Sequence, residues 1–223
     1  MALFVIGGQK GGTGKSTLAT NLAVALVRAG RDTLLVDTDR QHTASHWSDV
    51  RASDSALTPI TTLQKTGKLF AALRDLEDRY DDVIVDAGGF DSVELRTALC
   101  AADHLYSPVR ASQSDLWTLQ AMSELVSGAC EINARLRAHL VLSMAPTNPA
   151  ITETRDAIEL LREYEAFDIC RSIVRDRKAF RDAMFQGRGV LELGDRKAAE
   201  EIHAFTQEVM EHVSIPQTLA QAS

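Results

Sequence analysis

The sequence predicts an α/β fold with a doubly wound, mostly parallel sheet and helices on both faces. Short apolar runs of strand length alternate along the 223 residues with longer stretches whose apolar residues recur at helical spacing. A glycine-rich turn at residues 9–17 joins the first apolar run to the first helical stretch. The length suits one domain with a sizeable core, so we expect a single domain over residues 1–213 and a frayed tail over 214–223.

The individual elements follow from these patterns. Each predicted strand is a short, mostly apolar run, and in chain order the runs lie at residues 3–6, 33–36, 60–63, 82–85, 104–106 and 140–142, of which 60–63 is the weakest. Each predicted helix has apolar residues three or four positions apart, over residues 18–26, 68–79, 115–131, 152–164 and 195–213. This alternation favours a parallel sheet covered on both sides.

The turn at residues 9–17 reads Gln-Lys-Gly-Gly-Thr-Gly-Lys-Ser-Thr and has the pattern of a phosphate-binding loop. Its glycines allow backbone N–H groups to converge on one point, and the start of the following helix adds partial positive charge there. Lys15 can reach the β- and γ-phosphates of a nucleotide, and the Ser16 hydroxyl can ligate Mg²⁺. The predicted nucleotide-binding residues of the loop are Gly11, Gly12, Thr13, Gly14, Lys15, Ser16 and Thr17.

The loop departs from the standard pattern G-x-x-x-x-G-K-S/T at two positions. Gln9 replaces the first glycine, and Lys10 adds a second lysine that its own nucleotide does not need. The chain fits the deviant pattern K-G-G-x-G-K-S/T at every fixed position, and so it resembles the ParA/MinD family of P-loop ATPases. The resemblance implies that ATP and Mg²⁺ are the cofactors, that Lys10 crosses a dimer interface to the partner's phosphates, and that Lys10 and Lys15 are catalytic.

Acidic residues follow two of the predicted strands. Asp37 and Asp39 come after the strand at 33–36, and Asp86 comes after the strand at 82–85. Ligands of such sheets bind beyond the carboxyl ends of the strands, where a carboxylate can hold Mg²⁺ directly or through water. The resemblance implies that Asp39 orients or activates the attacking water, that Asp37 and Asp86 support the metal with Ser16, and that residues 86–89 sense the γ-phosphate. Arg40 stands where the family has proline.

The formal net charge of −7 by itself points away from nucleic acid. Basic residues nevertheless gather in one segment, with a local excess of +4, and we call them the basic cluster: Arg171, Arg175, Arg177, Lys178, Arg181 and Arg188. Composition alone favours a solvated helix face. The resemblance instead implies that an ATP-bound dimer binds DNA here without sequence preference, through counterion release, with Arg175, Lys178 and Arg181 at the core of the surface.

Other classes of protein fit the sequence less well. No apolar run approaches the roughly 18 residues of a membrane span, and residues 213–220 lack the basic side chains of an amphipathic membrane helix and contain Pro216. Cys100, Cys130 and Cys170 are isolated, which disfavours disulfides, a zinc site and the iron–sulfur relatives. Because the loop begins at residue 9, no helix-turn-helix domain is expected before it. We expect a cytoplasmic protein without membrane binding, associated with the nucleoid in its ATP state.

The resemblance therefore implies a short partition ATPase: a homodimer bridged by ATP that hydrolyses ATP slowly and segregates plasmids or chromosomes with a ParB-like partner that stimulates hydrolysis. A positioning ATPase for another cargo, such as a carboxysome or a chemoreceptor array, would share every motif. A metabolic kinase or ligase is less expected, because a monomer gives Lys10 no role.

For the adenine base, the resemblance implies a contact from Pro108 in a loop at 107–110, although Pro108 is also an ordinary turn residue. Met144 stands where relatives place a polar or basic residue against the base.

Overall fold

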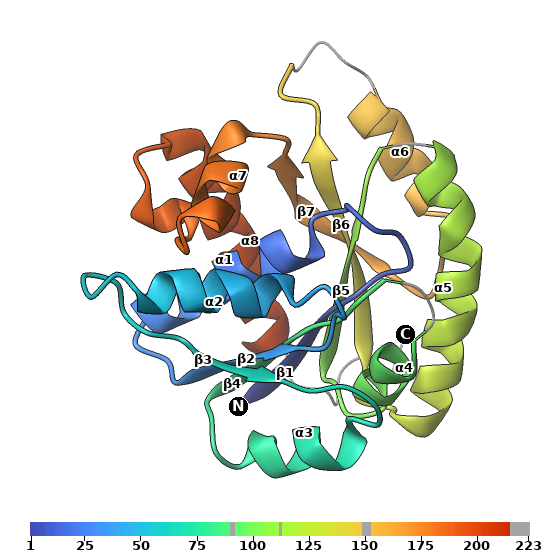
Figure 1. Ribbon diagram of the computed structural model, residues 1–223. Helices are drawn as coiled ribbons and strands as arrows, with labels where there is room; N and C mark the ends of the chain where they lie inside the picture. The colour runs from blue at the N-terminus through green and yellow to red at the C-terminus, as the bar shows by residue number, and fades with distance from the viewer. Residues whose placement is uncertain (90–91, 112, 149–152, 215–223) are drawn as a thin grey trace.

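Within residues 1–89, 92–111, 113–148 and 153–214, which the computed structural model describes, seven parallel strands form one sheet (Figure 1). The order of the strands across the sheet is β3-β2-β4-β1-β5-β6-β7. Their bounds are β1 (Ala2–Ile6), β2 (Thr33–Asp37), β3 (Thr61–Gln64), β4 (Asp82–Asp86), β5 (His104–Val109), β6 (Arg137–Ala145) and β7 (Asp168–Arg175). The predicted doubly wound, parallel sheet is therefore confirmed.

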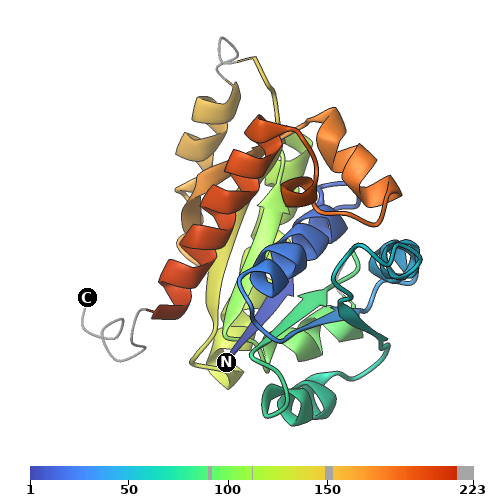
Figure 2. The ribbon, with the colours of Figure 1, turned by 90° about the vertical axis from the view of Figure 1, so that its left-hand side faces the viewer.

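Helices cover both faces of this sheet (Figures 1 and 2). One face carries α1 (Lys15–Arg28), α2 (Thr43–Ala52), α7 (Lys178–Phe185), the short 3₁₀ helix η1 (Val190–Glu192) and α8 (Arg196–Ser214). The other face carries α3 (Phe70–Glu77), α4 (Val93–Leu99), α5 (Gln113–Ile132) and α6 (Glu153–Leu161). In β1, Leu3 and Val5 pack against the second group of helices, while Phe4 and Ile6 pack against the first. A central strand covered on both faces therefore reads as one continuous apolar run.

The elements β7, α2, α4 and α7 lie outside the sequence prediction. In β7, exposed or half-exposed residues such as Asp168, Arg171 and Arg175 alternate with buried ones, because this strand forms one edge of the sheet. The strand therefore lacks the apolar run that marks its neighbours. The tail predicted at 214–223 begins at Ser214, the last residue of α8, and residues 215–223 lie outside the described residues.

A stack of rings joins α8 to strands β5 and β6. His104 Nδ1 lies 3.2 Å from His139 Nε2, and the rings of His139 and His212 are nearly parallel with centroids 4.2 Å apart. The Tyr106 hydroxyl lies 2.9 Å from His212 Nδ1. Burial lowers the pKa of His104 to about 4 and the pKa of His139 to about 2. The imidazoles of His104 and His139 are therefore neutral near pH 7.

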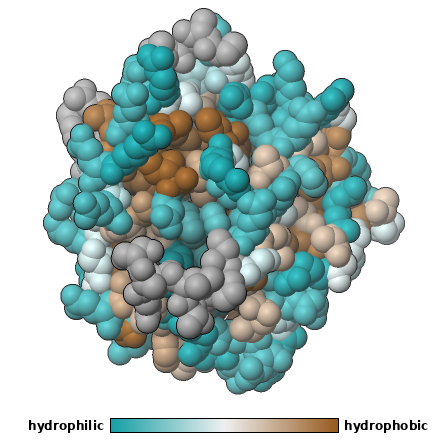
Figure 3. Space-filling model, turned by 180° about the vertical axis from the view of Figure 1, so that it is seen from behind, coloured by the Kyte–Doolittle hydropathy of each residue, from teal (hydrophilic) through white to brown (hydrophobic). Residues whose placement is uncertain are grey.

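Two glutamates of α8 close the free edge of β7. Glu208 accepts hydrogen bonds from the backbone N–H groups of Arg171 and Ser172, at 2.7 and 2.9 Å, and Glu201 accepts one from Arg175 N–H at 3.0 Å. These carboxylates take the place that a further strand would occupy. Seen from behind, much of the surface is hydrophilic, and the most extended hydrophobic area lies in the upper part of the view, with smaller ones elsewhere (Figure 3).

Glu208→Ala is expected to make the chain self-associate without nucleotide, because it exposes two backbone donors at a sheet edge. Sedimentation velocity at increasing protein concentration should show dimers and larger species. Glu211→Ala is the matched control, since Glu211 accepts bonds only from the side chains of Arg171 and Gln207 in the described structure and touches no backbone donor of β7. A monomeric Glu208→Ala variant at every concentration would contradict this account of the edge.

Candidate functional site

The predicted phosphate-binding loop joins β1 to α1 at the carboxyl edge of the sheet. Gly12 and Gly14 have φ values of 72° and 92°, which residues with a Cβ atom rarely adopt. At Gly14 a Cβ would also lie 2.9 Å from Ser143 Oγ, so the end of β6 packs directly against the loop. Gly14 is the N-cap of α1, and the helix N-terminus therefore faces the same place as the turn.

Lys15 is folded back into the loop. Its Nζ donates to the backbone oxygen of Lys10 at 2.8 Å, and only 7% of the residue is exposed. Burial lowers the pKa of Lys15, while the charges of Asp86 and Asp39 act in the opposite direction. A Cβ at Gly89 would lie 3.6 Å from Lys15 Nζ, so Gly89 lies close to the ammonium group. Lys15 thus stands among the loop, the end of β4 and the segment after β2.

Asp86 and Ser16 place a carboxylate and a hydroxyl next to one another beside the loop. Burial raises the pKa of Asp86 to about 7, a hydrogen bond from the Ser16 side chain opposes this rise, and the charge of Asp37 adds to it. Asp86 Oδ2 is buried and has no hydrogen-bond partner among the described residues. A hard cation such as Mg²⁺ suits this carboxylate and hydroxyl, because Mg²⁺ is commonly bound by one or two carboxylates together with phosphates and water. No group of three or more His, Cys, Asp or Glu within the described ranges could hold a metal ion by itself.

Asp37 and Asp39 differ in their surroundings. Asp37 is fully buried, and its oxygens accept from Asp39 N–H at 3.0 Å and from the Ser45 N–H and hydroxyl at 2.8 and 2.7 Å. The two bonds from Ser45 join β2 to the start of α2. Asp39 is half-buried and accepts from Gln41 N–H at 2.9 Å, and its carboxylate would lie 3.4 Å from a Cβ at Gly88. Asp37 therefore holds the segment after β2 in place, and Asp39 lies beside the segment after β4.

A cavity of about 250 Å³ opens next to the phosphate loop. It lies between the start of α1, the end of β6, the end of β7 and helix α7, and its walls are mainly apolar. The residues that line it are Gly14, Thr17, Leu18, Ser143, Met144, Val174, Arg175, Asp176, Arg177, Phe180, Arg181 and Met184. A flat apolar base attached to phosphates in the loop fits such a site. The sequence missed the walls from β7 and α7 because it did not predict those elements.

The prediction of a loop at residues 107–110 is wrong. Ser107, Pro108 and Val109 belong to β5, and Pro108 is buried with its backbone opposite Val141 of β6. Pro108 is not among the residues that line the cavity. Met144 does line the cavity, and it has a φ of 52°, which is unusual for a bulky residue. The structure therefore favours Met144 over Pro108 as a residue beside a bound base.

Each of the six residues of the basic cluster is ion-paired. Arg171 pairs with Glu208 and Glu211, Arg175 and Arg177 with Glu201, Lys178 with Asp182, Arg181 with Asp176, and Arg188 with Asp54. The excess of +4 holds only along the chain. In the folded protein it is offset, because carboxylates from α8 and from residue 54 face the cluster. The cluster is also not one helix face, since it runs from β7 through α7 to the following loop.

The side chains of the basic cluster differ in how far they reach into solvent. Those of Arg171, Lys178 and Arg181 are 73, 78 and 63% exposed, whereas that of Arg177 is 17% exposed. Exposed ion pairs contribute little to stability and exchange their partners readily. Lys178 and Arg181, which both lie on α7, can therefore turn toward an external anion at a small cost in free energy. Arg177 instead stabilises the fold.

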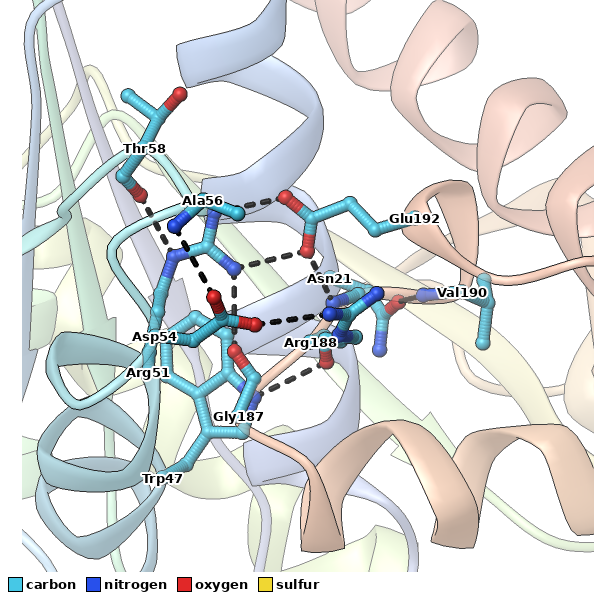
Figure 4. A network of polar contacts seen from close by, with 11 residues as sticks. Asn21, Trp47, Arg51, Asp54, Ala56, Thr58, Gly187, Arg188, Val190 and Glu192 are labelled. Atoms are coloured by element: carbon cyan, nitrogen blue, oxygen red, sulfur yellow. Dashed lines mark hydrogen bonds and ion pairs between the residues drawn. The ribbon is translucent and has the colours of Figure 1, made fainter.

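A buried network links α1, α2 and the segment after α7 (Figure 4). Arg51 of α2 donates from Nη1 and Nη2 to Glu192, both at 2.8 Å, and also to the backbone oxygens of Thr58 and Gly187. The indole N–H of Trp47 donates to the Arg188 oxygen at 3.1 Å. Asn21 of α1 accepts from Val190 N–H and donates to the Thr17 oxygen, both at 2.8 Å. The helix that follows the phosphate loop and the helix that follows β2 are thus fixed to one another.

Comparison with known protein families gives a match over most of the chain. Residues 4–190 match the family model described as the CobQ/CobB/MinD/ParA nucleotide binding domain. The matched region begins inside β1 and contains β2–β7, the phosphate loop, Asp37, Asp39 and Asp86. Within the described residues, no helix combines the length and the hydropathy needed to cross a bilayer.

Individual relatives agree with this match. The chain is 31% identical over 205 residues to the "Maintenance of carboxysome distribution protein A" of Halothiobacillus neapolitanus, which covers 90% of this chain and 93% of that protein. It is 32% identical over 161 residues to the "Chromosome-partitioning ATPase Soj" of Thermus thermophilus, covering 60% and 64% of the two chains. Among solved structures, apo McdA of Cyanothece superposes with a TM-score of 0.76 at 18% identity, covering 94% of this chain and 99% of that one, and so shares the fold.

Proposed function

The chain belongs to the CobQ/CobB/MinD/ParA nucleotide-binding domain family, and from this premise we propose that it is a positioning ATPase that acts as an ATP-bridged homodimer on DNA. The observation that carries the proposal is the convergence of Lys15, Ser16, Asp39 and Asp86 around a loop that begins with the second lysine, Lys10. A monomeric kinase or ligase would use the first four residues but would leave Lys10 without a role.

Each residue of the site has a separate task in this proposal. The loop glycines and Thr13 bind the phosphates through backbone N–H groups, and Lys15 exchanges the Lys10 oxygen for phosphate oxygens. Ser16 and Asp86 would hold Mg²⁺, which when bound neutralises charge on the phosphates. Asp39 orients the attacking water, and Asp37 keeps the segment of Asp39 in register with the start of α2. The base occupies the cavity beside Met144 and Phe180.

In this proposal, Lys10 couples ATP hydrolysis to the formation and dissociation of the dimer. Its carbonyl oxygen serves Lys15 of the same subunit, and we assign its side chain to the phosphates of the partner. ATP would then stabilise the dimer that completes both sites, and hydrolysis would release it. A partner protein that inserts a positive charge at the site would shorten the life of the dimer.

DNA binding is assigned to the exposed part of the basic cluster. Lys178 and Arg181 exchange Asp182 and Asp176 for DNA phosphates, with release of counterions from the DNA. Because one subunit offers few such cations, two subunits are needed for useful affinity, and DNA binding therefore depends on ATP. Arg175 and Arg177 share Glu201 and contribute less.

The relatives favour a protein assembly as the cargo over a plasmid or chromosome. The carboxysome distribution protein matches 90% of this chain at 31% identity, whereas the Soj protein of Bacillus subtilis matches the same share at 19% identity. Cargo choice would lie in an adaptor protein, which replaces the ParB-like partner in this version of the proposal. Isolation of the proteins that bind the ATP-bound dimer would identify the adaptor, and the adaptor would identify the cargo.

Lys10→Ala is expected to keep ATP affinity within about threefold of wild type but to lose dimerisation and at least tenfold in DNA affinity. Wild-type protein should bind random duplex DNA only with ATP and Mg²⁺, and the logarithm of its affinity should fall linearly with the logarithm of salt concentration. Fluorescence anisotropy of labelled DNA with ATP, ADP or no nucleotide across a salt series measures DNA affinity. Anisotropy of a labelled ATP analogue measures nucleotide affinity, and sedimentation velocity measures dimerisation.

The matched control is Lys178→Ala/Arg181→Ala, which should still dimerise with ATP but reduce the steepness of the salt dependence. The proposal fails if Lys10→Ala binds DNA as well as wild type does with ATP. If wild type binds ATP but binds DNA in no nucleotide state, the DNA assignment falls and the metabolic enzyme becomes the better interpretation.

A further inference from the structure

Arg110 joins the phosphate loop to the wall of the neighbouring cavity. It directly follows β5, and its Nη2 donates to the backbone oxygen of Gly12 and to Met144 Sδ, the latter at 3.0 Å. The proposed function gives this arginine no role, and no motif in the sequence marks it. Its guanidinium group carries a permanent charge and a rigid fork of donors, so it can hold two acceptors at once.

The contact with Gly12 fixes one peptide of the loop. The Lys10 oxygen is held from within the loop by Lys15 and Thr13, whereas the Gly12 oxygen is held by a side chain from another strand. Gly12 has a φ of 72° and is exposed, so its backbone has wide conformational freedom. Because a trans peptide is planar, the orientation of the Gly12 carbonyl also sets the opposite orientation of the Thr13 N–H.

The contact with Met144 fixes one side of the cavity. Met144 adopts a left-handed backbone conformation that a bulky residue avoids unless its surroundings enforce it. It follows Ser143, whose hydroxyl packs against Gly14, and both residues line the cavity. One guanidinium group therefore sets the position of the loop and of the cavity wall together.

We propose that Arg110 is a positioning residue for nucleotide binding: it holds the Gly12 carbonyl so that the Thr13 N–H is aligned for phosphate, and it holds Met144 against the base. This inference rests on the proposed nucleotide site. It assigns to Arg110 a part in binding and none in the attack on phosphorus, because its contacts with Gly12 and Met144 lie on the phosphate loop and the cavity wall.

The test compares two ligands on folded wild-type and variant proteins. ADP uses both the loop and the cavity, whereas inorganic pyrophosphate uses the loop alone. Arg110→Ala should weaken both ligands by about tenfold, the loss expected when a charge-assisted hydrogen bond that organises a site is removed. Its KM for ATP should rise by a similar factor with kcat within twofold of wild type. Arg110→Lys should recover part of the affinity, because a single ammonium group cannot reproduce the planar fork.

Met144→Leu separates the two contacts, since it removes the sulfur acceptor and leaves the loop contact in place. It should weaken ADP by two- to threefold and leave pyrophosphate unchanged. Wild-type affinity of Arg110→Ala for both ligands would overturn the inference while the nucleotide site stands. A loss confined to ADP would overturn the role at Gly12, and absence of ADP and pyrophosphate binding in wild type would overturn the proposed site itself. If Arg110→Ala does not fold, Arg110→Lys carries the same comparison.

Discussion

Arg51→Met is expected to lower the free energy of unfolding by about 3–5 kcal/mol, the usual cost of removing one partner of a buried ion pair. Arg51 is 2% exposed and satisfies both oxygens of Glu192 together with the backbone oxygens of Thr58 and Gly187 (Figure 4). Methionine fills part of the volume but leaves the Glu192 carboxylate with only the Gly189 N–H as its remaining donor in the network. Urea unfolding followed by circular dichroism measures the change.

Two further variants make this result specific. Arg79→Met removes an arginine from an exposed pair with Asp75 on a neighbouring turn and should change stability by less than about 0.5 kcal/mol. Arg51→Met/Glu192→Gln should be less destabilised than the sum of the two single variants, because the second change removes the stranded charge. A loss below about 1 kcal/mol in Arg51→Met would show that the network does not hold α2 in place.

Acidification from pH 7 to pH 5 is expected to remove about 4 kcal/mol of stability through His104 and His139. Burial depresses the pKa of both imidazoles below the unfolded value of about 6.5. Between the folded and the unfolded pKa values, these two imidazoles therefore bind protons in the unfolded chain but not in the folded chain. The stabilisation is complete above about pH 6.5 and is lost as the pH falls toward the folded pKa values of about 4 and about 2. Urea unfolding at half-unit pH steps measures this slope.

His139→Phe should retain the ring packing and remove about 2 kcal/mol of the acid-induced loss, because one buried imidazole no longer takes up a proton on unfolding. His203→Phe is the matched control on the same helix as His212, since His203 is exposed and makes no ring contact with His104, His139 or His212 within the described structure. A His139→Phe variant with the full wild-type pH dependence would assign the acid sensitivity to carboxylates elsewhere.

The central strands and the phosphate loop could be predicted because their determinants are local. β1, β2 and β4 are continuous apolar runs, and the loop is recognised from nine consecutive residues. The edge strand β7 escaped prediction because an edge carries charged residues at alternate positions. Without β7 and α7, the prediction lacks two walls of the cavity, and the base contact at Pro108 rests on the family resemblance alone.

Contacts between distant segments account for the remaining differences. The charge of the basic cluster was counted along the chain, whereas Glu201, Glu208 and Asp54 reach it only after folding. The bonds from Ser45 to Asp37 join residues eight apart in a segment without a periodic pattern. Arg110 meets Gly12 across 98 positions of sequence, and nothing in a single sequence marks such a pair.

The position of Trp47 gives the chain an optical reporter of the position of α2. The indole is 2% exposed, donates its N–H to the Arg188 oxygen, and lies 5.4 Å from the Arg51 guanidinium carbon. The sequence contains one other tryptophan, Trp117 in α5, so a Trp117→Phe background isolates the signal. A movement of α2 would change the contact between the cation and the indole ring, and so its emission. Intrinsic fluorescence can thus follow the helix after β2 in real time without an attached dye.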